Sequence, residues 1–145
     1  MRVQIRNLQT LPVDEALLAD AARATLRVAG GELGAAEIAI VDDRRIRAVN
    51  REYRNCDLPT DVIAFEAEDG PAGRVGEIII SAETADRQAQ EAGQSLQAEL
   101  CLLVAHGVLH ALGYEDHNEP ARARMRALQE RALESVAERL SQHER

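Results

Sequence analysis

The segment that decides the fold is His106-Gly-Val-Leu-His-Ala-Leu-Gly-Tyr-Glu-Asp-His117, which holds three of the four histidines in the chain. His106 and His110 are four residues apart, so an α-helix places both side chains on one face, one turn apart. Gly113 can end such a helix, because glycine adopts the left-handed conformation at little cost. The chain can then turn and bring His117 back toward the pair.

Three imidazoles arranged in this way have the layout of a catalytic rather than a structural zinc site. Three protein ligands leave one tetrahedral position for water. A histidine on an apolar helix is more often a core residue with a hydrogen-bond partner, and a pair at this spacing also arises by chance. Three of four histidines within twelve residues favour the metal site over that alternative. The residues therefore predict one Zn²⁺ ion on His106, His110 and His117.

The helix that carries the pair is expected to be buried. Ser95 is the predicted N-cap. The apolar side chains that follow cover most of the circumference, which is typical of a central helix; they are Leu96, Leu100, Leu102, Leu103, Val104, Val108, Leu109 and Leu112. Burial of two imidazoles costs free energy unless both are bonded, and a metal ion would bond both.

Composition limits the class of protein. A chain of 145 residues with 46% hydrophobic residues predicts one globular domain, residues 1–145. The net charge of −8 argues against nucleic-acid binding by overall charge, so such binding would need a local basic patch. Cys56 and Cys101 do not form a disulfide pattern, which fits a cytoplasmic protein. The longest apolar run, near residues 100–105, is too short to span a bilayer, so no membrane partner is expected.

Hydrophobic periodicity predicts an α+β fold: a four-stranded mixed sheet packed with about five helices. We expect strands over residues 2–6, 36–42, 60–66 and 75–81, and helices over residues 14–29, 43–53, 81–93, 95–112 and from 119 to about 140. The last two strands should be antiparallel, because only a short polar loop, residues 68–73, joins them.

The helix over residues 43–53 is rich in arginine. Arg44, Arg47, Arg51 and Arg54 are spaced by three or four and share a face. Such a face is as often simply solvated as it is a phosphate-binding patch. Arg54 is the strongest candidate for a phosphate contact. It lies where the helix gives way to a loop, and guanidinium groups bind phosphate through paired hydrogen bonds.

Residues 106–117 resemble the H-G-x-L-H-x-x-G-Y-D-H signature of the YbeY family of bacterial metal-dependent endoribonucleases. Three upstream segments resemble the family in the same order: Val49-Asn50 through Tyr53-Arg54, Pro59 through Phe65, and Val75-Gly-Glu-Ile78. The resemblance implies a zincin-like central helix with one zinc ion on three histidines. It places His106 and His110 on the first two ligands and Arg54 on the family's functional arginine.

The same resemblance implies a function. The family's activity is that of a single-strand-specific endoribonuclease in maturation of the 16S rRNA 3′ end and in ribosome quality control. The expected partners are rRNA and the ribosome or its associated proteins, in the cytoplasm. Few aromatic residues are present for base stacking, so specificity would come from RNA shape, the arginines or a partner.

The third ligand departs from the family pattern. The family places it six residues after the second ligand, whereas His117 follows His110 by seven. Either the turn bulges and His117 still binds the metal, or Asp116 takes its place. His117 is favoured because three imidazoles suit zinc.

Two other functions remain open from the residues. One is a zinc hydrolase of peptide or amide bonds, and the other is a non-catalytic ribosome assembly factor with a structural metal. Zinc proteases of the HExxH type carry a glutamate base after the first histidine, where this chain has Gly107, which argues against the first. Gly107 is instead expected to leave room for the substrate backbone beside the metal, with Arg54 holding the phosphate.

Overall fold

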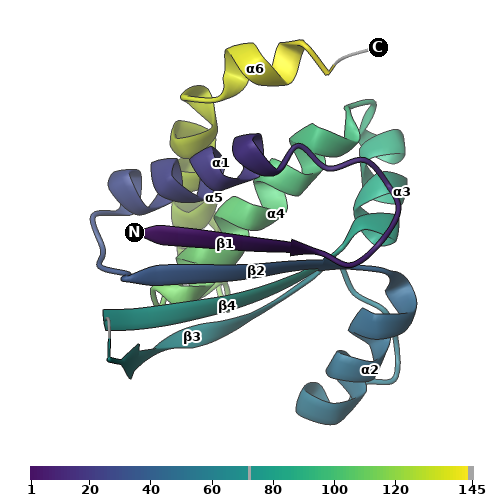
Figure 1. The fold of residues 1–145 in the computed structure, drawn as a ribbon. Coiled ribbons are helices and arrows are strands. Elements are labelled where there is room, and N and C mark those ends of the chain that lie inside the picture. Colours follow the sequence, from purple (N-terminus) through teal and green to yellow (C-terminus); the bar gives the residue numbers. More distant parts are fainter. Residues whose placement is uncertain (72, 144–145) are drawn as a thin grey trace.

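The computed structural model describes residues 1–71 and 73–143. The elements follow in the order β1 (Arg2–Asn7), α1 (Glu15–Ala29), β2 (Ala35–Val41), α2 (Asp43–Arg54), β3 (Val62–Gly70), β4 (Gly73–Ser81), α3 (Ala82–Ala92), α4 (Leu96–Ala111), α5 (Glu119–Glu134) and α6 (Ala137–Ser141). Figure 1 shows the sheet between two unequal layers of helices. The expected α+β architecture with a four-stranded mixed sheet is confirmed.

The sheet has the strand order β1-β2-β4-β3. Strands β1, β2 and β4 are parallel, and β3 runs antiparallel to β4, as its short connection requires. The central strands β2 and β4 carry alternating isoleucines that point into the main core: Ile38, Ile40, Ile78 and Ile80, each at most 1% exposed. This alternation is the period of two that a strand imposes on its side chains.

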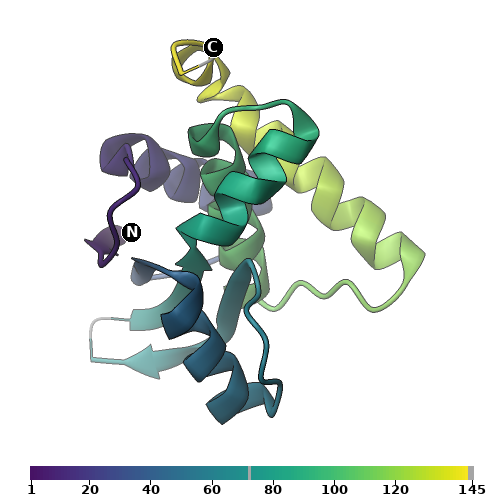
Figure 2. The same cartoon turned by 90° about the vertical axis from the view of Figure 1, so that its right-hand side faces the viewer.

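Helices cover the two faces of the sheet very differently. Helices α1, α3 and α4 lie on one face and enclose the main core with β2 and β4, while α5 packs on α1 and α4 (Figure 1). Helix α2 lies on the other face (Figures 1 and 2). Beneath it is a small second cluster built on Val41, Ile46 and Ile63. The sheet thus separates a deep core from a shallow one.

Helix α4 is the central helix that its composition predicts, and it packs against α1, α3, α5, β3 and β4. Two glycines allow it to approach the sheet closely. A Cβ atom on Gly107 would lie 2.6 Å from Ile78 Cγ2, and one on Gly76 of β4 would lie 2.9 Å from Ala111 Cβ. Contacts this short do not occur between real side chains, so glycine is required where the helix crosses the strand.

The structure corrects two predicted boundaries. The polar segment expected to be a loop, residues 68–73, belongs mostly to the β3–β4 hairpin, which has a register shift between Phe65 and Glu68. Glu66, Glu68 and Asp69 are exposed, and charged residues do not stop a strand whose faces are open to water.

The predicted last helix is two helices, α5 and α6, which are separated at Ser135 and Val136. Val136 lies in this break, is only 2% exposed and joins the main core. Among residues 1–71 and 73–143, none of the helices combines the length and the hydrophobicity that a bilayer crossing demands.

Candidate metal centre

Helix α4 presents His106 and His110 side by side on one face. Their Nε2 atoms are 3.0 Å apart, and their rings meet edge to face with centroids 4.6 Å apart. Each side chain keeps somewhat more than a quarter of its surface exposed, at 28% and 29%. The pair therefore lies at the rim of the core, where a metal ion and a substrate could both reach it.

A tight turn after α4 returns the chain to this pair. Gly113 has a φ of 100°, and the N–H of Tyr114 donates to the carbonyl of Leu109 at 3.0 Å. Beyond the turn, the backbone carbonyl oxygen of Asp116 accepts a hydrogen bond from the Arg122 side chain at 3.3 Å. Asn118 then caps α5 by accepting from the N–H of Ala121. The turn and the cap fix the path of the segment between the two helices.

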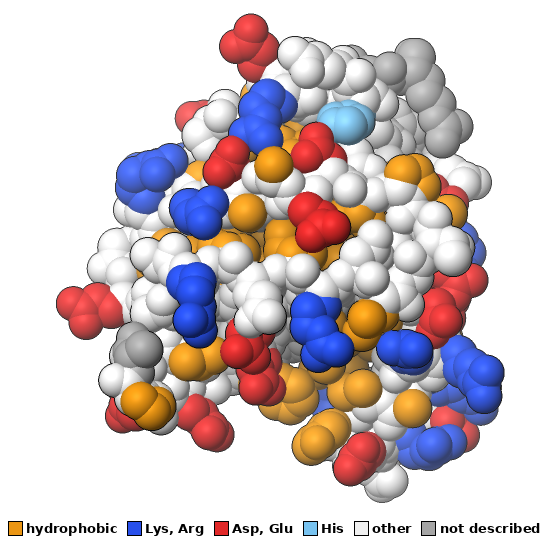
Figure 3. All heavy atoms as spheres, viewed as in Figure 1, with side chains coloured by type: hydrophobic (Ala, Val, Ile, Leu, Met, Phe, Trp, Pro, Cys, Tyr) orange, Lys and Arg blue, Asp and Glu red, His pale blue; other side chains and the backbone are white. Residues whose placement is uncertain are grey.

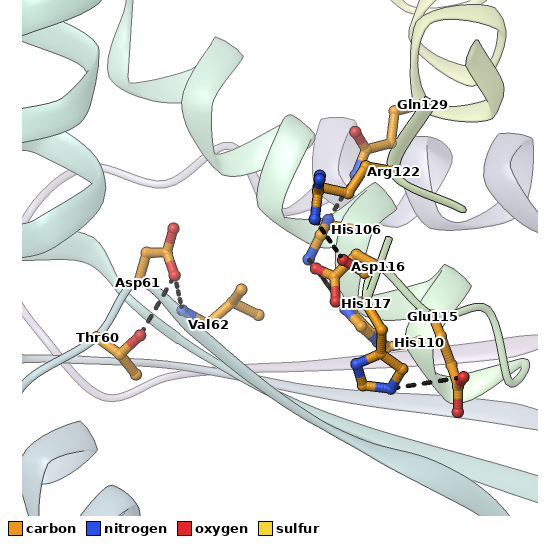
Figure 4. A network of polar contacts seen from close by, with 10 residues as sticks. All are labelled: Thr60, Asp61, Val62, His106, His110, Glu115, Asp116, His117, Arg122 and Gln129. Atoms are coloured by element: carbon orange, nitrogen blue, oxygen red, sulfur yellow. Dashed lines mark hydrogen bonds and ion pairs between the residues drawn. The ribbon is translucent and has the colours of Figure 1, made fainter. Parts of the chain in front are cut away.

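Asp116 completes a group with the histidine pair (Figure 4). Its Oδ2 atom lies 3.9 Å from His106 Nε2 and 3.8 Å from His110 Nε2. These three residues, here called the His–Asp group, offer ligand atoms that all lie within 4.8 Å of one another. In the part of the chain that the structure describes, no other histidine, cysteine or carboxylate cluster meets that criterion.

The His–Asp group has dimensions that suit a metal ion. Ligand atoms about 2.0–2.1 Å from a tetrahedral zinc ion lie roughly 3.3 Å from each other. The observed separations of 3.0, 3.8 and 3.9 Å bracket that value. Two imidazoles and a carboxylate are also a common donor set of catalytic zinc sites. The residues present therefore fit a divalent metal ion.

His117 lies outside the His–Asp group. Its side chain is 75% exposed, and its Nε2 atom is 3.5 Å from Glu115 Oε2 (Figure 4). The sequence favoured His117 as the third ligand, but the structure brings Asp116 against the pair instead. A role for His117 in metal binding stays a prediction.

The environment of His106 favours the neutral imidazole. Burial lowers its pKa below the ordinary value, and the nearby His110 lowers it further. The charges of Asp116 and Asp61 act in the opposite direction, but the net shift is downward. A neutral imidazole retains a free lone pair, which is the form that binds a metal ion.

Sequence reasoning missed a residue that contacts this group. Gln129 of α5 is 7% exposed, and its Nε2 atom lies 2.7 Å from His106 Nδ1 (Figure 4). A signal was available, because Gln129 falls between Met125 and Ala132 on the apolar face of α5. A polar side chain on a buried face needs a partner there.

Asp61 lies across from the histidines, at the entrance to β3 (Figure 4). Its Oδ1 atom accepts from the N–H of Val62 at 2.8 Å, and its Oδ2 atom accepts from Gln88 at 3.3 Å. Strand β3 packs beside α4, so the segment between α2 and β3 leads from Arg54 toward the candidate centre. Asn50 holds this segment on α2, because its Nδ2 atom donates to the carbonyl of Leu58 at 2.9 Å.

The four predicted arginines form an exposed face of α2, here called the arginine face. Figure 3 shows basic side chains gathered over this helix. Arg47 is paired with Asp57 at 2.8 and 3.3 Å, and Arg51 lies 3.8 Å from the same carboxylate. Within the described residues, no hydrogen bond or ion pair links Arg54 or Arg44 to the His–Asp group. Their roles in catalysis and substrate binding stay predictions.

The structure overturns the interpretation of Gly107. This residue was expected to leave space for a substrate beside the metal. It is buried and faces Ile78 of β4, so its missing side chain makes room for the sheet. A glutamate at this position would collide with β4, which gives a structural reason why an HExxH arrangement cannot form here.

Known proteins match the chain over most of its length. The family model described as Endoribonuclease YbeY matches residues 4–137. A protein named Endoribonuclease YbeY from Heliobacterium modesticaldum is 47% identical over 132 residues, which cover 81% of this chain and 80% of that protein. A protein of the same name from Pelotomaculum thermopropionicum is 43% identical over 145 residues, covering 92% of this chain and 95% of its own.

A solved structure shares the fold. The solution structure of TM1509 from Thermotoga maritima matches with a TM-score of 0.66 at 23% sequence identity. The match covers 97% of this chain and 95% of the TM1509 chain. The same fold thus recurs in a chain of distant sequence. With the family model spanning residues 4–137 and relatives above 40% identity along nearly the whole length, the chain belongs to the YbeY family.

Proposed function

We propose that this chain is a metal-dependent endoribonuclease that cleaves single-stranded rRNA. The observation that carries the proposal is the His–Asp group on α4, with three ligand atoms within 4.8 Å of one another in a member of the YbeY family. The relatives that match the chain are named endoribonucleases. Gly107 argues against the peptide hydrolase, because β4 occupies the space of the glutamate base.

We infer that one zinc ion is held by His106, His110 and Asp116. The separations in the His–Asp group support this ligand set, and so does burial, which lowers the pKa of His106 and so favours its neutral form. When bound, the metal would supply Lewis acidity toward a phosphoryl oxygen and lower the pKa of its water. His117 is the alternative third ligand, because it is the next residue after Asp116 and three imidazoles suit zinc.

The residues of the chain would bind and orient the substrate. Arg54, at the end of α2, would hold a phosphate of the RNA through paired hydrogen bonds and offset the charge that develops on it. Arg44, Arg47 and Arg51 would extend this contact along the backbone, because an exposed arginine face attracts phosphate without reading sequence. The net charge of −8 makes such a local patch necessary.

The natural substrate is proposed to be the 3′ end of 16S rRNA, in the cytoplasm and with the ribosome or its associated proteins as partners. The resemblance to the family supports this assignment. The low aromatic content fits an enzyme that takes its specificity from RNA shape or from a partner.

Three assays on the purified chain test the proposal. Elemental analysis should find about one equivalent of zinc. The zinc-loaded protein should cut a single-stranded RNA oligonucleotide internally, leave the matched duplex intact and leave casein undigested. Loss of RNA cleavage on treatment with chelator, with recovery on adding zinc, would tie the activity to the metal. Zinc-loaded protein that cuts no RNA would instead support a non-catalytic assembly factor, and digestion of casein would support the peptide hydrolase.

A further inference from the structure

The contact between Gln129 and His106 joins two helices beneath the candidate metal centre. Gln129 Nε2 lies 2.7 Å from His106 Nδ1, on the side of the ring opposite the His–Asp group. An amide can donate through its nitrogen or accept through its oxygen, so this contact serves either tautomer of His106. On the other side of the ring, His110 Nε2 lies 3.0 Å from His106 Nε2. The two contacts together hold the ring in place from both sides.

Metal binding requires one of the two tautomers. A metal ion bound through Nε2 would use the lone pair of that atom, so a neutral ring would carry its proton on Nδ1. The Nδ1–H group then needs an acceptor, and it points at the side chain of Gln129, which is only 7% exposed. Water has little access there, so the acceptor has to come from the protein. The amide meets this need when it presents its oxygen instead of its nitrogen.

We propose that Gln129 is a positioning residue that fixes the ring of His106 and accepts its Nδ1 proton when a metal ion is bound. This inference rests on the proposed metal site. An amide donates through nitrogen and accepts through oxygen, so it serves both tautomers by turning about its last bond. The more usual outer partner of a metal-binding histidine is a carboxylate, which only accepts and favours the bound state alone.

The first test needs neither metal nor activity. In metal-free Gln129→Glu, ¹⁵N NMR should find the proton of His106 on Nδ1, because a carboxylate can only accept from the ring. In metal-free Gln129→Leu, which offers Nδ1 neither a donor nor an acceptor, the share of the Nδ1–H tautomer should be lower. A proton on Nε2 in Gln129→Glu, or equal tautomer populations in the two variants, would show that residue 129 does not bond the ring and would overturn the proposal.

The second test measures zinc affinity by competition with a chelator. Gln129→Glu should bind zinc about tenfold more tightly than wild type, and Gln129→Leu about 10- to 100-fold less tightly, the usual range for outer partners of a metal ligand. Gln97→Leu is the matched control. Gln97 is also buried, at 6% exposed, but its side chain bonds Asp14 and Pro12 at the other end of α4.

The control separates positioning from stability. Gln97→Leu should lower the melting temperature while zinc affinity stays at the wild-type value. Equal zinc affinity in Gln129→Leu, Gln97→Leu and wild type would show that Gln129 only packs α5 against α4. A wild-type protein that binds no zinc would contradict the proposed metal site itself, a failure that the NMR result on metal-free protein identifies separately.

Discussion

Helices α4 and α2 both carry residues that the sequence marks for function, but they lie in opposite environments. Helix α4 is buried on most of its surface, and its polar side chains are held by neighbours: His106 by His110 and Gln129. Helix α2 covers only a small cluster on the other face of the sheet, and its arginine face is open to water. One helix is built for fixed geometry and the other for charge.

The difference teaches how each kind of function depends on the fold. A metal ion needs ligand atoms placed within tenths of an ångström, which rigid packing provides. A phosphate backbone needs positive charge near the right place, which long, solvated side chains provide without precise packing. Substitutions in α4 should therefore act strongly on metal binding and stability. Those in α2 should act on RNA cleavage and binding while the fold stays intact.

The largest expected effect is that of His110→Ala. Removal of one imidazole leaves two ligands, so zinc affinity should fall by more than about 100-fold, above the range for loss of an outer partner. RNA cleavage should fall with it. Elemental analysis after dialysis and a cleavage assay at fixed zinc would measure both. A variant that retained stoichiometric zinc would contradict the proposed site.

The next effect separates the two candidates for the third ligand. Asp116→Ala should weaken zinc binding at least tenfold, because Asp116 Oδ2 lies within 4 Å of both histidine Nε2 atoms. His117→Ala, at a 75% exposed position, should leave the affinity close to wild type. Chelator competition on the two variants gives the answer directly. The reverse order would assign the ligand to His117, as the sequence favoured.

Arg54→Ala tests the helix on the other face. Loss of one charge-assisted phosphate contact should lower RNA cleavage by roughly ten- to a hundredfold, while zinc content and melting temperature stay at wild-type values. Arg54→Lys should restore only part of the rate, since an ammonium cannot make paired contacts. Arg27→Ala, an exposed arginine on α1, is the control of equal charge. Wild-type cleavage by Arg54→Ala at equal zinc would refute the phosphate role.

Gly107→Ala should destabilise the fold although it adds a single methyl group. The new Cβ would lie 2.6 Å from Ile78 Cγ2, and such overpacking costs about 1–3 kcal/mol. Urea unfolding of the metal-free protein would measure the loss. In an Ile78→Ala background the same change should cost much less, because the two sites share one contact. An equal cost in both backgrounds would show that β4 is not the obstacle.

The smallest effects belong to the rest of the arginine face. Arg44→Ala should weaken RNA binding a few-fold and reduce the salt dependence by about one phosphate contact. Arg47→Ala should have a smaller effect, because Arg47 is already paired with Asp57. The hydrogen bond from Arg47 lowers the pKa of the Asp57 carboxyl below its usual value, so the pair stays charged. Asp57→Asn should then strengthen binding. Titrations at several salt concentrations would rank the three variants.

The sequence by itself determined the main elements of the fold and the first part of the site. The spacing of four between His106 and His110 lies within one helix, and a helix has a fixed period, so their proximity follows from local structure alone. The apolar circumference of α4 predicted its burial, and the short link between β3 and β4 predicted their antiparallel pairing.

Only the tertiary structure decided which residues of different helices and strands meet. The sequence favoured His117 as the third ligand, but which side chain lies against the histidine pair depends on the path of a turn fixed by Gly113 and by contacts with α5, and there the structure brings Asp116. The sequence predicted that Gly107 leaves room for the substrate, whereas in the structure Ile78 of β4 lies against Gly107. It gave no role to Gln129, which is 23 residues from His106 along the chain and 2.7 Å from it in space. Periodicity specifies which face of a helix is buried, but packing alone specifies what that face meets.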